Sequence, residues 1–229
     1  MVETIVPGKV NGTIPAPPSK SSMQRACAAA LLHQGETILS RPGKADDDLA
    51  ALSVIQALGA KVDALPDGRL RIISQGVHPQ TKVLDCGESG LGIRMFTPLA
   101  ALSDQALTIQ GRGSLVKRPM DFFDEVLPQL GVGVSTQGGK LPLEVKGPLQ
   151  ARSIQIDGSM SSQFLTGLLM AFATTANTDV VIEVNDLKSK PYIDLTLSVL
   201  AHFGWEVVHE NHARFRFQAR KPQPEQINY

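Results

Sequence analysis

The chain has 229 residues, and its 42% hydrophobic and 19% charged residues are typical of a globular protein with one large domain or two small ones. Its 22 lysines and arginines equal its 22 aspartates and glutamates in number, so the formal net charge is zero. This balance argues against nucleic acid or an anionic membrane as a partner held by bulk electrostatics. No apolar stretch approaches the ~18 residues that suggest a membrane span, so we expect no transmembrane segment.

The N-terminal residues, the cysteines and the histidines bear on the cellular compartment and on metal binding. The first ten residues, MVETIVPGKV, lack a basic region followed by an apolar run, so they predict no signal peptide. Cys27 and Cys86 fit a reducing compartment better than a disulfide framework, and we predict a cytoplasmic protein. There is no CxxC motif and no histidine cluster with metal-ligand spacing, so we predict no metal site. The scattered histidines are His33, His78, His202, His209 and His212.

The first predicted elements follow the paired prolines of PPSKSSMQR. We predict a helix over residues 19–33, a strand at ETILSR and a second helix over 46–58. Gly59 comes directly after the second helix, where a left-handed C-cap needs glycine. Two further strands follow, joined by the turn sequence PDG.

The same order of elements recurs twice. The second unit has a strand at KVLDCG, a helix over 90–102, a strand at QALTIQG, a helix over 118–130 and two strands around QGG. The third has a strand at SIQIDG, a helix over 161–174, a strand at DVVIEV, a helix over 191–203 and two strands around ENH. The second helices again end at glycines, Gly131 and Gly204, which lie 72 and 145 residues after Gly59.

Three units of one kind predict an internal repeat. We place the βαβαββ units at about residues 14–77, 82–148 and 152–220, and three matches of order and glycine placement make chance resemblance a poor alternative. Paired strands close every unit, so neither a TIM barrel nor a Rossmann fold fits. The apolar segments ACAAALL and FLTGLLMAF indicate buried helices. The predicted fold is therefore an α/β (α+β) domain with pseudo-threefold symmetry, helices inside and sheets outside.

The first helices of the units begin with polar residues, although the helices themselves are apolar. In a threefold domain these starts meet, and helix N-termini with hydroxyls and cations make an anion site. The second helices begin with similar chemistry, and Pro119 and Pro191 are predicted at the first helical position. We therefore predict a pocket for a small anionic ligand that carries a phosphate. The polar groups at these starts are Ser19, Lys20, Ser21 and Arg25; Glu88, Ser89, Gly90 and Arg94; Ser159, Ser161, Ser162 and Gln163; and Lys44, Lys117, Arg118, Lys188, Ser189, Lys190 and Tyr192.

Structural explanations compete with this interpretation. Ser19, Ser89 and Ser161 can be plain helix N-caps, and the acidic run at 46–48 can complement a helix dipole. Arg25 and Arg94 are harder to explain, because each interrupts an apolar helix and a buried guanidinium needs a partner. That partner is either an anionic ligand or a carboxylate of Glu88 or of residues 46–48.

Five stretches carry a family resemblance. PPSKSSMQR, DCGESGLGIRMF, LVKRPMDFF, GSMSSQFLTGLLM and LKSKPYIDLTL, in this order, resemble the 5-enolpyruvylshikimate-3-phosphate (EPSP) synthase family across nearly the whole chain. GSMSSQFLTGLLM and SKPYIDLTL separate this family from the UDP-N-acetylglucosamine enolpyruvyl transferases, which share the fold. The resemblance implies an inside-out α/β domain of three βαβαββ units, in agreement with the repeats.

The resemblance also implies an activity. The family transfers the enolpyruvyl group of phosphoenolpyruvate to shikimate 3-phosphate, releases phosphate and uses no metal or organic cofactor. Lys20 is expected to contact both substrates and to be catalytic by assisting proton transfer. The expected shikimate 3-phosphate ligands are Lys20, Ser21, Arg25, Ser161, Ser162, Gln163, Ser189 and Tyr192. The expected phosphoenolpyruvate ligands are Lys20, Gly90, Arg118 and Gln163, with Arg94 in support.

The sequence departs from the family in two respects. Glu88 and Leu91 stand where the family often has Asn and Thr, and an unpaired carboxylate at Glu88 would repel phosphoenolpyruvate. The chain is also about half the family's length, which implies that a second domain with the catalytic aspartate and glutamate is missing. We therefore expect residues 14–226 to form the N-terminal domain, residues 1–13 to belong with the second domain, and 227–229 to start the crossover.

Two functions follow from this interpretation. The chain is expected to be a monomeric enzyme half that binds shikimate 3-phosphate and is inactive until its partner domain is added. The alternative is a non-catalytic binding or scaffold domain of the same fold. An RNA 3′-phosphate cyclase-like protein is disfavoured by the zero net charge and the lack of nucleotide-binding signals.

Overall fold

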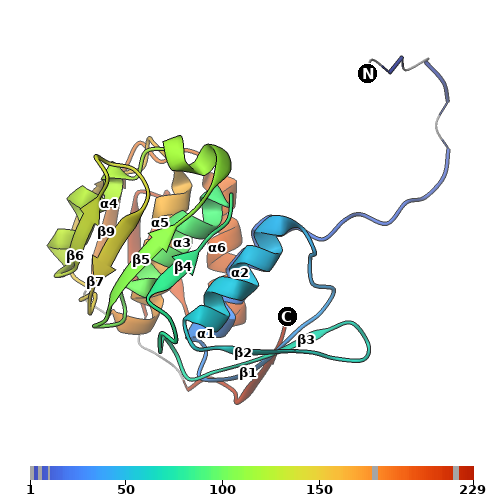
Figure 1. Cartoon of the computed structure of the whole chain (residues 1–229), viewed down its shortest axis with the longest axis horizontal. Helices are drawn as coiled ribbons and strands as arrows, with labels where there is room; N and C mark the ends of the chain where they lie inside the picture. Colours follow the sequence, from blue (N-terminus) through green and yellow to red (C-terminus); the bar gives the residue numbers. More distant parts are fainter. Residues whose placement is uncertain (1–2, 5–6, 10, 177–179, 219–221) are drawn as a thin grey trace.

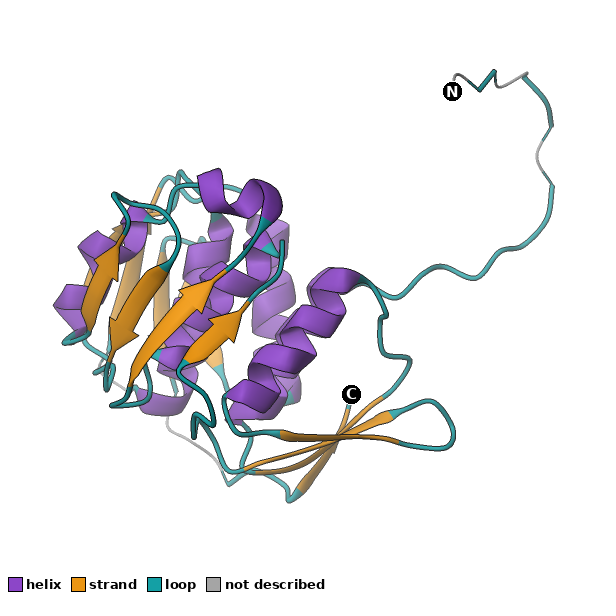
Figure 2. Ribbon diagram, in the orientation of Figure 1, coloured by secondary structure: helices purple, strands orange, loops and turns teal. Residues whose placement is uncertain are grey.

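The computed structural model describes residues 3–4, 7–9, 11–176, 180–218 and 222–229. In this part of the chain, three four-stranded sheets surround a group of helices (Figure 1). The predicted α/β class with helices inside and sheets outside is confirmed. The described residues before Lys20 are exposed and lie in no helix or strand, and the trace of this segment leads away from the body (Figure 2).

The elements repeat in the predicted order. The first unit comprises α1 (Lys20–Leu32), β1 (Gly35–Leu39), α2 (Asp46–Ala57), β2 (Lys61–Ala64) and β3 (Leu70–Ser74). The second comprises β4 (Val83–Asp85), α3 (Gly90–Ala100), β5 (Ala106–Gln110), η1 (Gly113–Lys117), α4 (Asp121–Val126), η2 (Leu127–Leu130), β6 (Gly133–Thr136) and β7 (Leu143–Lys146). The third comprises β8 (Ile154–Asp157), α5 (Ser162–Thr175), β9 (Val181–Asn185), α6 (Lys190–His202), β10 (Val207–Glu210) and β11 (Arg214–Phe217).

The three sheets share one topology. Their strand orders are β12-β1-β3-β2, β4-β5-β7-β6 and β8-β9-β11-β10, and the first two strands of each order run parallel. In the second and third units the leading strand, β4 or β8, is also the first element of the unit in the chain. In the first unit that place is taken by β12 (Gln226–Asn228), where Glu36 pairs with Gln226 and Ile38 with Asn228. The C-terminal residues thus complete the first sheet, which the residues of that unit did not predict.

The predicted glycine caps are confirmed. Gly59, Gly131 and Gly204 have φ of 109°, 76° and 84°, in the left-handed region that ends a helix and that glycine adopts without steric cost. Each residue follows the second helix of its unit and reverses the chain toward the next strand. The equal spacing of these residues therefore reports a real structural repeat.

The core lies among α1, α3 and α5, which contact one another and are buried over almost their whole length. This explains why their sequences are apolar nearly all round. The backbones come close where Gly167 of α5 faces α3: a Cβ added at Gly167 would lie 2.7 Å from the carbonyl oxygen of Arg94 and 2.9 Å from that of Met95. Gly167 therefore permits the central helix crossing.

The predicted helix over 118–130 is wrong in its first part. Residues 113–117 form the 3₁₀ helix η1, Arg118 is extended, and α4 begins only at Asp121. The backbone N–H of Met120 donates to the carbonyl of Gly139 at 2.7 Å, and the Met120 side chain is buried. Met120 is the N-cap of α4, so Pro119 lies outside the helix, whereas Pro191 is the second residue of α6, one position after the predicted one.

None of the helices in the described ranges is both long and apolar enough to cross a membrane.

Candidate functional site

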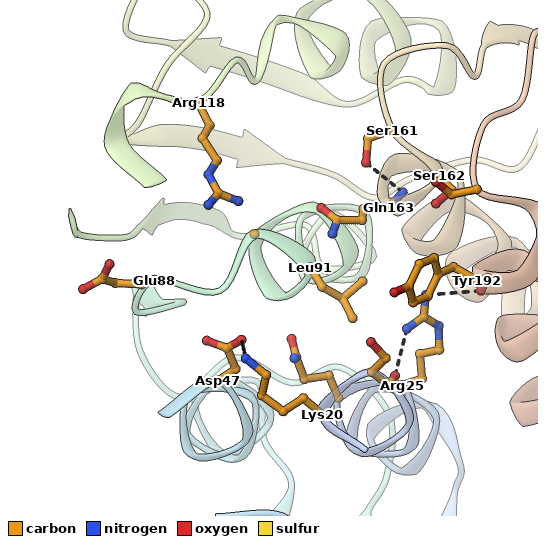
Figure 3. A pocket seen from close by; sticks show the side chains of 14 residues that line it. Lys20, Arg25, Asp47, Glu88, Leu91, Arg118, Ser161, Ser162, Gln163 and Tyr192 are labelled. Atoms are coloured by element: carbon orange, nitrogen blue, oxygen red, sulfur yellow. Dashed lines mark hydrogen bonds and ion pairs between the residues drawn. The ribbon is translucent and has the colours of Figure 1, made fainter. Parts of the chain in front are cut away.

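The starts of the helices meet at one pocket of about 360 Å³. Figure 3 shows that α1, α2, α3, α5 and α6, together with the segment after η1, direct side chains toward it. The predicted convergence of helix N-termini is therefore confirmed. The lining residues are Lys20, Ser21, Gln24, Arg25, Asp47, Glu88, Gly90, Leu91, Arg118, Ser161, Ser162, Gln163, Ser189 and Tyr192.

Lys20 and Asp47 form an ion pair at one side of the pocket (Figure 3). Its Nζ lies 2.9 Å from Asp47 Oδ2, and the lysine side chain is 54% exposed. The hydrogen bond and the negative charge of Asp47 raise the pKa of Lys20, so the amine is held as an ammonium. Because the pair is exposed, its contribution to fold stability is small, and an anionic ligand can compete for the ammonium.

Arg25 is buried among neutral groups. Its Nε donates to Thr196 Oγ1 at 2.8 Å and its Nη1 to the carbonyl of Ser21 at 2.8 Å, while Nη2 reaches Thr166 Oγ1 and the carbonyl of Tyr192 at 3.4 and 3.3 Å. Only 1% of the residue is exposed, and burial lowers the pKa of Arg25 to about 10. No carboxylate in the described part of the chain pairs with Arg25, so its positive charge remains uncompensated at the pocket wall.

Arg94 lies behind the pocket rather than in its wall. Its Nη1 donates to Gln163 Oε1 at 2.8 Å, and its guanidinium carbon is 4.9 Å from the centroid of the Phe164 ring. Burial, and secondarily the charge of Arg118, lower the pKa of Arg94. Arg94 thus orients Gln163 toward the pocket. Neither Arg25 nor Arg94 pairs with Glu88 or with the acidic residues 46–48, the carboxylates that the sequence had suggested.

The hydroxyl groups at the helix starts divide into two classes. Ser19 and Ser89 cap α1 and α3 by accepting backbone N–H groups and do not line the pocket, so the structural explanation holds for them. Ser161 caps α5 and also lines the pocket. The acidic run at 46–48 is likewise divided, because Asp48 accepts the N–H of Ala45 at 3.0 Å while Asp47 faces the pocket.

Ser189 has the least regular backbone of the lining residues. Its φ of 56° and ψ of 45° are left-handed, a conformation that costs energy in a residue other than glycine. Its side chain makes no capping hydrogen bond at the start of α6, and no hydrogen bond to another described residue engages its hydroxyl. Ser189 is therefore an exposed residue with a left-handed backbone, and its hydroxyl is available at the pocket wall.

The family model for EPSP synthase (3-phosphoshikimate 1-carboxyvinyltransferase) matches residues 5–227. The chain belongs to the EPSP synthase family. A curated relative named 3-phosphoshikimate 1-carboxyvinyltransferase from Clostridium beijerinckii is 34% identical over 219 residues, which are 92% of this chain and 50% of that protein. One of the same name from Methanocorpusculum labreanum is 37% identical over 203 residues, or 87% and 48%. The chain thus spans about half the length of these relatives.

Solved structures support the fold. EPSP synthase from Acinetobacter baumannii superposes with a TM-score of 0.79 at 23% identity, over 95% of this chain and 49% of that chain. The enolpyruvyl transferase NikO from Streptomyces tendae gives a TM-score of 0.67 at 15% identity, over 95% and 50%. At these identities the likeness shows a shared architecture, and it covers half of each solved chain.

Most of the residues predicted from the EPSP synthase resemblance meet in the pocket, and Arg94 alone of that set stands behind it. Lys44, Lys117, Lys188 and Lys190, which the charge pattern included, do not line it. The ligand roles assigned to the lining residues stay predictions.

Sequence reasoning missed Gln24 as a pocket residue. Gln24 is 2% exposed, lines the pocket, and accepts a hydrogen bond from Ser89 Oγ at 2.7 Å, which joins α1 to the start of α3. It follows Lys20 by four residues, so helical periodicity placed it on the same face. Thr166 and Thr196, the buried partners of Arg25, lie on two other helices, and no local signal indicated them.

Glu88, the departure from the EPSP synthase pattern, faces the mouth of the pocket. It is exposed and forms no ion pair with a described residue, and its carboxylate packs where a side chain at Gly113 would stand. Among the described residues Glu88 therefore has no ion-pair partner, and Figure 3 shows its carboxylate apart from the Arg118 guanidinium. Exposure to water weakens the repulsion of an anion in the pocket.

Gly90 leaves room for Arg118. A Cβ added at Gly90 would lie 2.5 Å from Arg118 Nη1, the far end of an exposed side chain. We expect Gly90→Ala to leave thermal stability unchanged or slightly raised, because alanine favours the helix and the arginine can move. The family resemblance assigns phosphoenolpyruvate to Arg118, and on that assignment KM for phosphoenolpyruvate in an enzyme reconstituted with a relative's second half should rise by about 10-fold, the effect of losing one charged hydrogen bond.

Gly133→Ala is the matched control for this prediction. The nearest atom to a Cβ added there is the Lys146 carbonyl oxygen at 3.7 Å, so the substitution meets no obstacle and is remote from the pocket. Equal KM values for both variants would show that the position of Arg118 does not influence this substrate.

Proposed function

We propose that this chain is the shikimate 3-phosphate-binding half of an EPSP synthase, a 3-phosphoshikimate 1-carboxyvinyltransferase of aromatic amino acid biosynthesis. Residues 14–226 form its N-terminal domain, and a second half supplies the remaining catalytic groups. The half alone is inactive, because the resemblance assigns the catalytic aspartate and glutamate to the other domain. The proposal rests on family membership together with the pocket at the helix starts.

The assignment of the substrate rests on the guanidinium of Arg25, whose charge no carboxylate of the described residues compensates. A buried cation without a carboxylate partner costs free energy, and an anionic ligand offsets that cost. Tyr192 lies with its ring centroid 6.0 Å from the Arg25 guanidinium carbon and presents an exposed face on which a carbocycle can pack. A carboxylated ring beside Arg25 and Tyr192 fits shikimate, whose carboxylate complements the arginine.

The phosphate of the same substrate fits the third unit. Ser161, Ser162 and Ser189 line one side of the pocket, where α5 begins and Ser161 Oγ accepts the backbone N–H of Gln163. The free hydroxyl of Ser189 supplies a further donor. These groups favour a phosphate by hydrogen bonding and by the positive end of the helix dipole.

Phosphoenolpyruvate fits the side of the pocket opposite the three serines. Arg118 and Lys20 provide positive charge there, Gly90 allows close approach of the backbone, and Gln163 is oriented between the two sides by Arg94. Lys20 stands where it can contact both substrates and hold a proton on Nζ once a ligand displaces Asp47. The fixed donors position the two anions for reaction and stabilise charge as it develops.

A calorimetric titration of shikimate 3-phosphate into the chain tests this assignment, with unphosphorylated shikimate as the control. We expect saturable binding of the phosphorylated compound, and binding at least tenfold weaker without the phosphate, which corresponds to about 1.4 kcal/mol. Equal affinity for both compounds would contradict the phosphate site at α5. Tyr192→Ala should weaken both ligands, because the ring is common to them.

Complementation separates an enzyme half from a scaffold domain. With shikimate 3-phosphate present as the acceptor, release of phosphate from phosphoenolpyruvate should stay at background with this chain alone and appear when a relative's second half is added. Turnover by the isolated chain, or none with a partner half that binds it, would contradict the enzyme-half proposal. We also propose that the chain is a monomer and that it acts in the cytoplasm. The buried, unpaired Cys27 and Cys86 would stay reduced in that compartment.

A further inference from the structure

Two histidines and an aspartate meet on the outer side of α6, away from the pocket. His212 Nε2 lies 2.5 Å from Asp194 Oδ1, and the rings of His209 and His212 have centroids 4.2 Å apart. One ligand atom from each of the three residues lies within 4.8 Å of the others. The cluster joins α6 to the hairpin of β10 and β11, with His209 in β10 and His212 in the turn.

The turn after β10 brings His212 back beside His209 and against Asp194 of α6. Asn211 and His212 have φ of 52° and 58°, so the chain reverses tightly after β10, and the N–H of His212 donates to Nδ1 of His209 at 3.2 Å. The side chain of His212 is 19% exposed against 55% for Asp194. The central imidazole is therefore packed in place, while the carboxylate retains the freedom to adjust.

We propose that Asp194, His209 and His212 form a binding site for a divalent transition metal, with Zn²⁺ as the best match. Imidazole nitrogens and one carboxylate oxygen are ligands that Zn²⁺ accepts, and three protein ligands leave a fourth position to water. Ligand bonds of about 2.0–2.2 Å require the three atoms to adjust by roughly 1 Å, which side-chain rotation at the exposed Asp194 and His209 provides. The ligating imidazole nitrogens carry no proton, so the metal bonds replace the hydrogen bond from the His212 N–H to His209 and that between His212 and Asp194.

The bound ion would tie two elements of the third unit together. Asp194 is in the first turns of α6, the helix that also carries Tyr192, whereas the histidines belong to the hairpin of the adjacent sheet. Binding to the folded chain alone stabilises it by mass action, since the unfolded chain has no preformed site. A rise in Tm that a chelator reverses is therefore expected in addition to direct binding.

The test is a calorimetric titration of Zn²⁺ into the chain without a purification tag, with Tm measured in Zn²⁺ and after EDTA. We expect one saturable equivalent. Loss of a partner that only orients a metal ligand typically costs about 10–100-fold in affinity, so Asp194→Asn, His209→Gln and His212→Asn should each weaken binding at least tenfold. His212→Asn keeps a residue that tolerates positive φ, which protects the turn.

Two control variants make the result specific. Glu210→Gln removes an exposed carboxylate beside His209, and His78→Gln removes an exposed histidine elsewhere in the chain; neither should change Zn²⁺ affinity. Absence of saturable binding to the folded chain, or equal loss in a control and a cluster variant, would overturn the site. Because the pocket is not involved, this outcome is independent of shikimate 3-phosphate binding.

Discussion

Arg25→Met is expected to reduce the affinity for shikimate 3-phosphate by about 100-fold, or ~3 kcal/mol, the upper range for hydrogen bonds to a charged group. Methionine is long and flexible enough to fill most of the space among α1, α5 and α6, so the fold should survive. Removing the guanidinium relieves a buried charge, and the hydroxyls of Thr166 and Thr196 still bond to each other. The measurement is calorimetric titration of both proteins, with circular dichroism to confirm folding.

Arg69→Met is the matched control. Arg69 is an exposed arginine in the β2–β3 turn, paired with Asp67 at 2.7 Å, and it lies outside the pocket. Its replacement should leave the dissociation constant unchanged. Unaltered binding by a folded Arg25→Met protein would mean that the uncompensated guanidinium does not receive the substrate, and the proposed orientation of the ligand would be wrong.

Gly167→Val is expected to destabilise the chain by about 3 kcal/mol or more, because overpacking of a core costs ~1–3 kcal/mol when the neighbours can move and here they are backbone atoms of α3. For a domain of this size the corresponding fall in Tm is roughly 6–12 °C. The larger side chain forces α3 and α5 apart, and both helices begin at the pocket. Thermal unfolding followed by circular dichroism measures the effect.

Ala201→Val is the control, because valine lowers helix stability slightly even where it causes no overpacking. Ala201 is exposed on α6, so valine there meets solvent rather than a neighbouring helix. We expect a change of about 0.5 kcal/mol for this control. A loss of stability in Gly167→Val no larger than the control would show that the helices do not approach as closely as the structure places them.

The repeat architecture was predictable because local sequence patterns indicate each of its elements. Apolar runs, turn residues and the glycines Gly59, Gly131 and Gly204 each act within a few residues along the chain. The prediction was wrong over 118–120, where Met120 is held by Gly139 of a later hairpin. It also lacked β12, since that strand pairs with β1 from the other end of the chain.

At the candidate site, too, local features were predictable and contacts between distant residues were not. Lys20 and Arg25 stood out because charge at an apolar helix start is a local anomaly. Asp47 had appeared as a dipole complement, and its ion pair with Lys20 depends on how α1 and α2 are placed. The sequence also predicted no metal site, because the third candidate ligand of His209 and His212 comes from α6 rather than from their own strand pair.

The sequence by itself determined the three units, the buried first helices and the polar chemistry at their starts, because hydrophobic period, capping and turn preference are properties of neighbouring residues. Only the tertiary structure decided which charges are compensated. Arg25 meets threonines from two other helices, Arg94 meets Gln163, and neither meets a carboxylate in the described chain. Pairing between distant side chains follows from the packing of whole elements, and burial then sets what each charge costs and what ligand it favours.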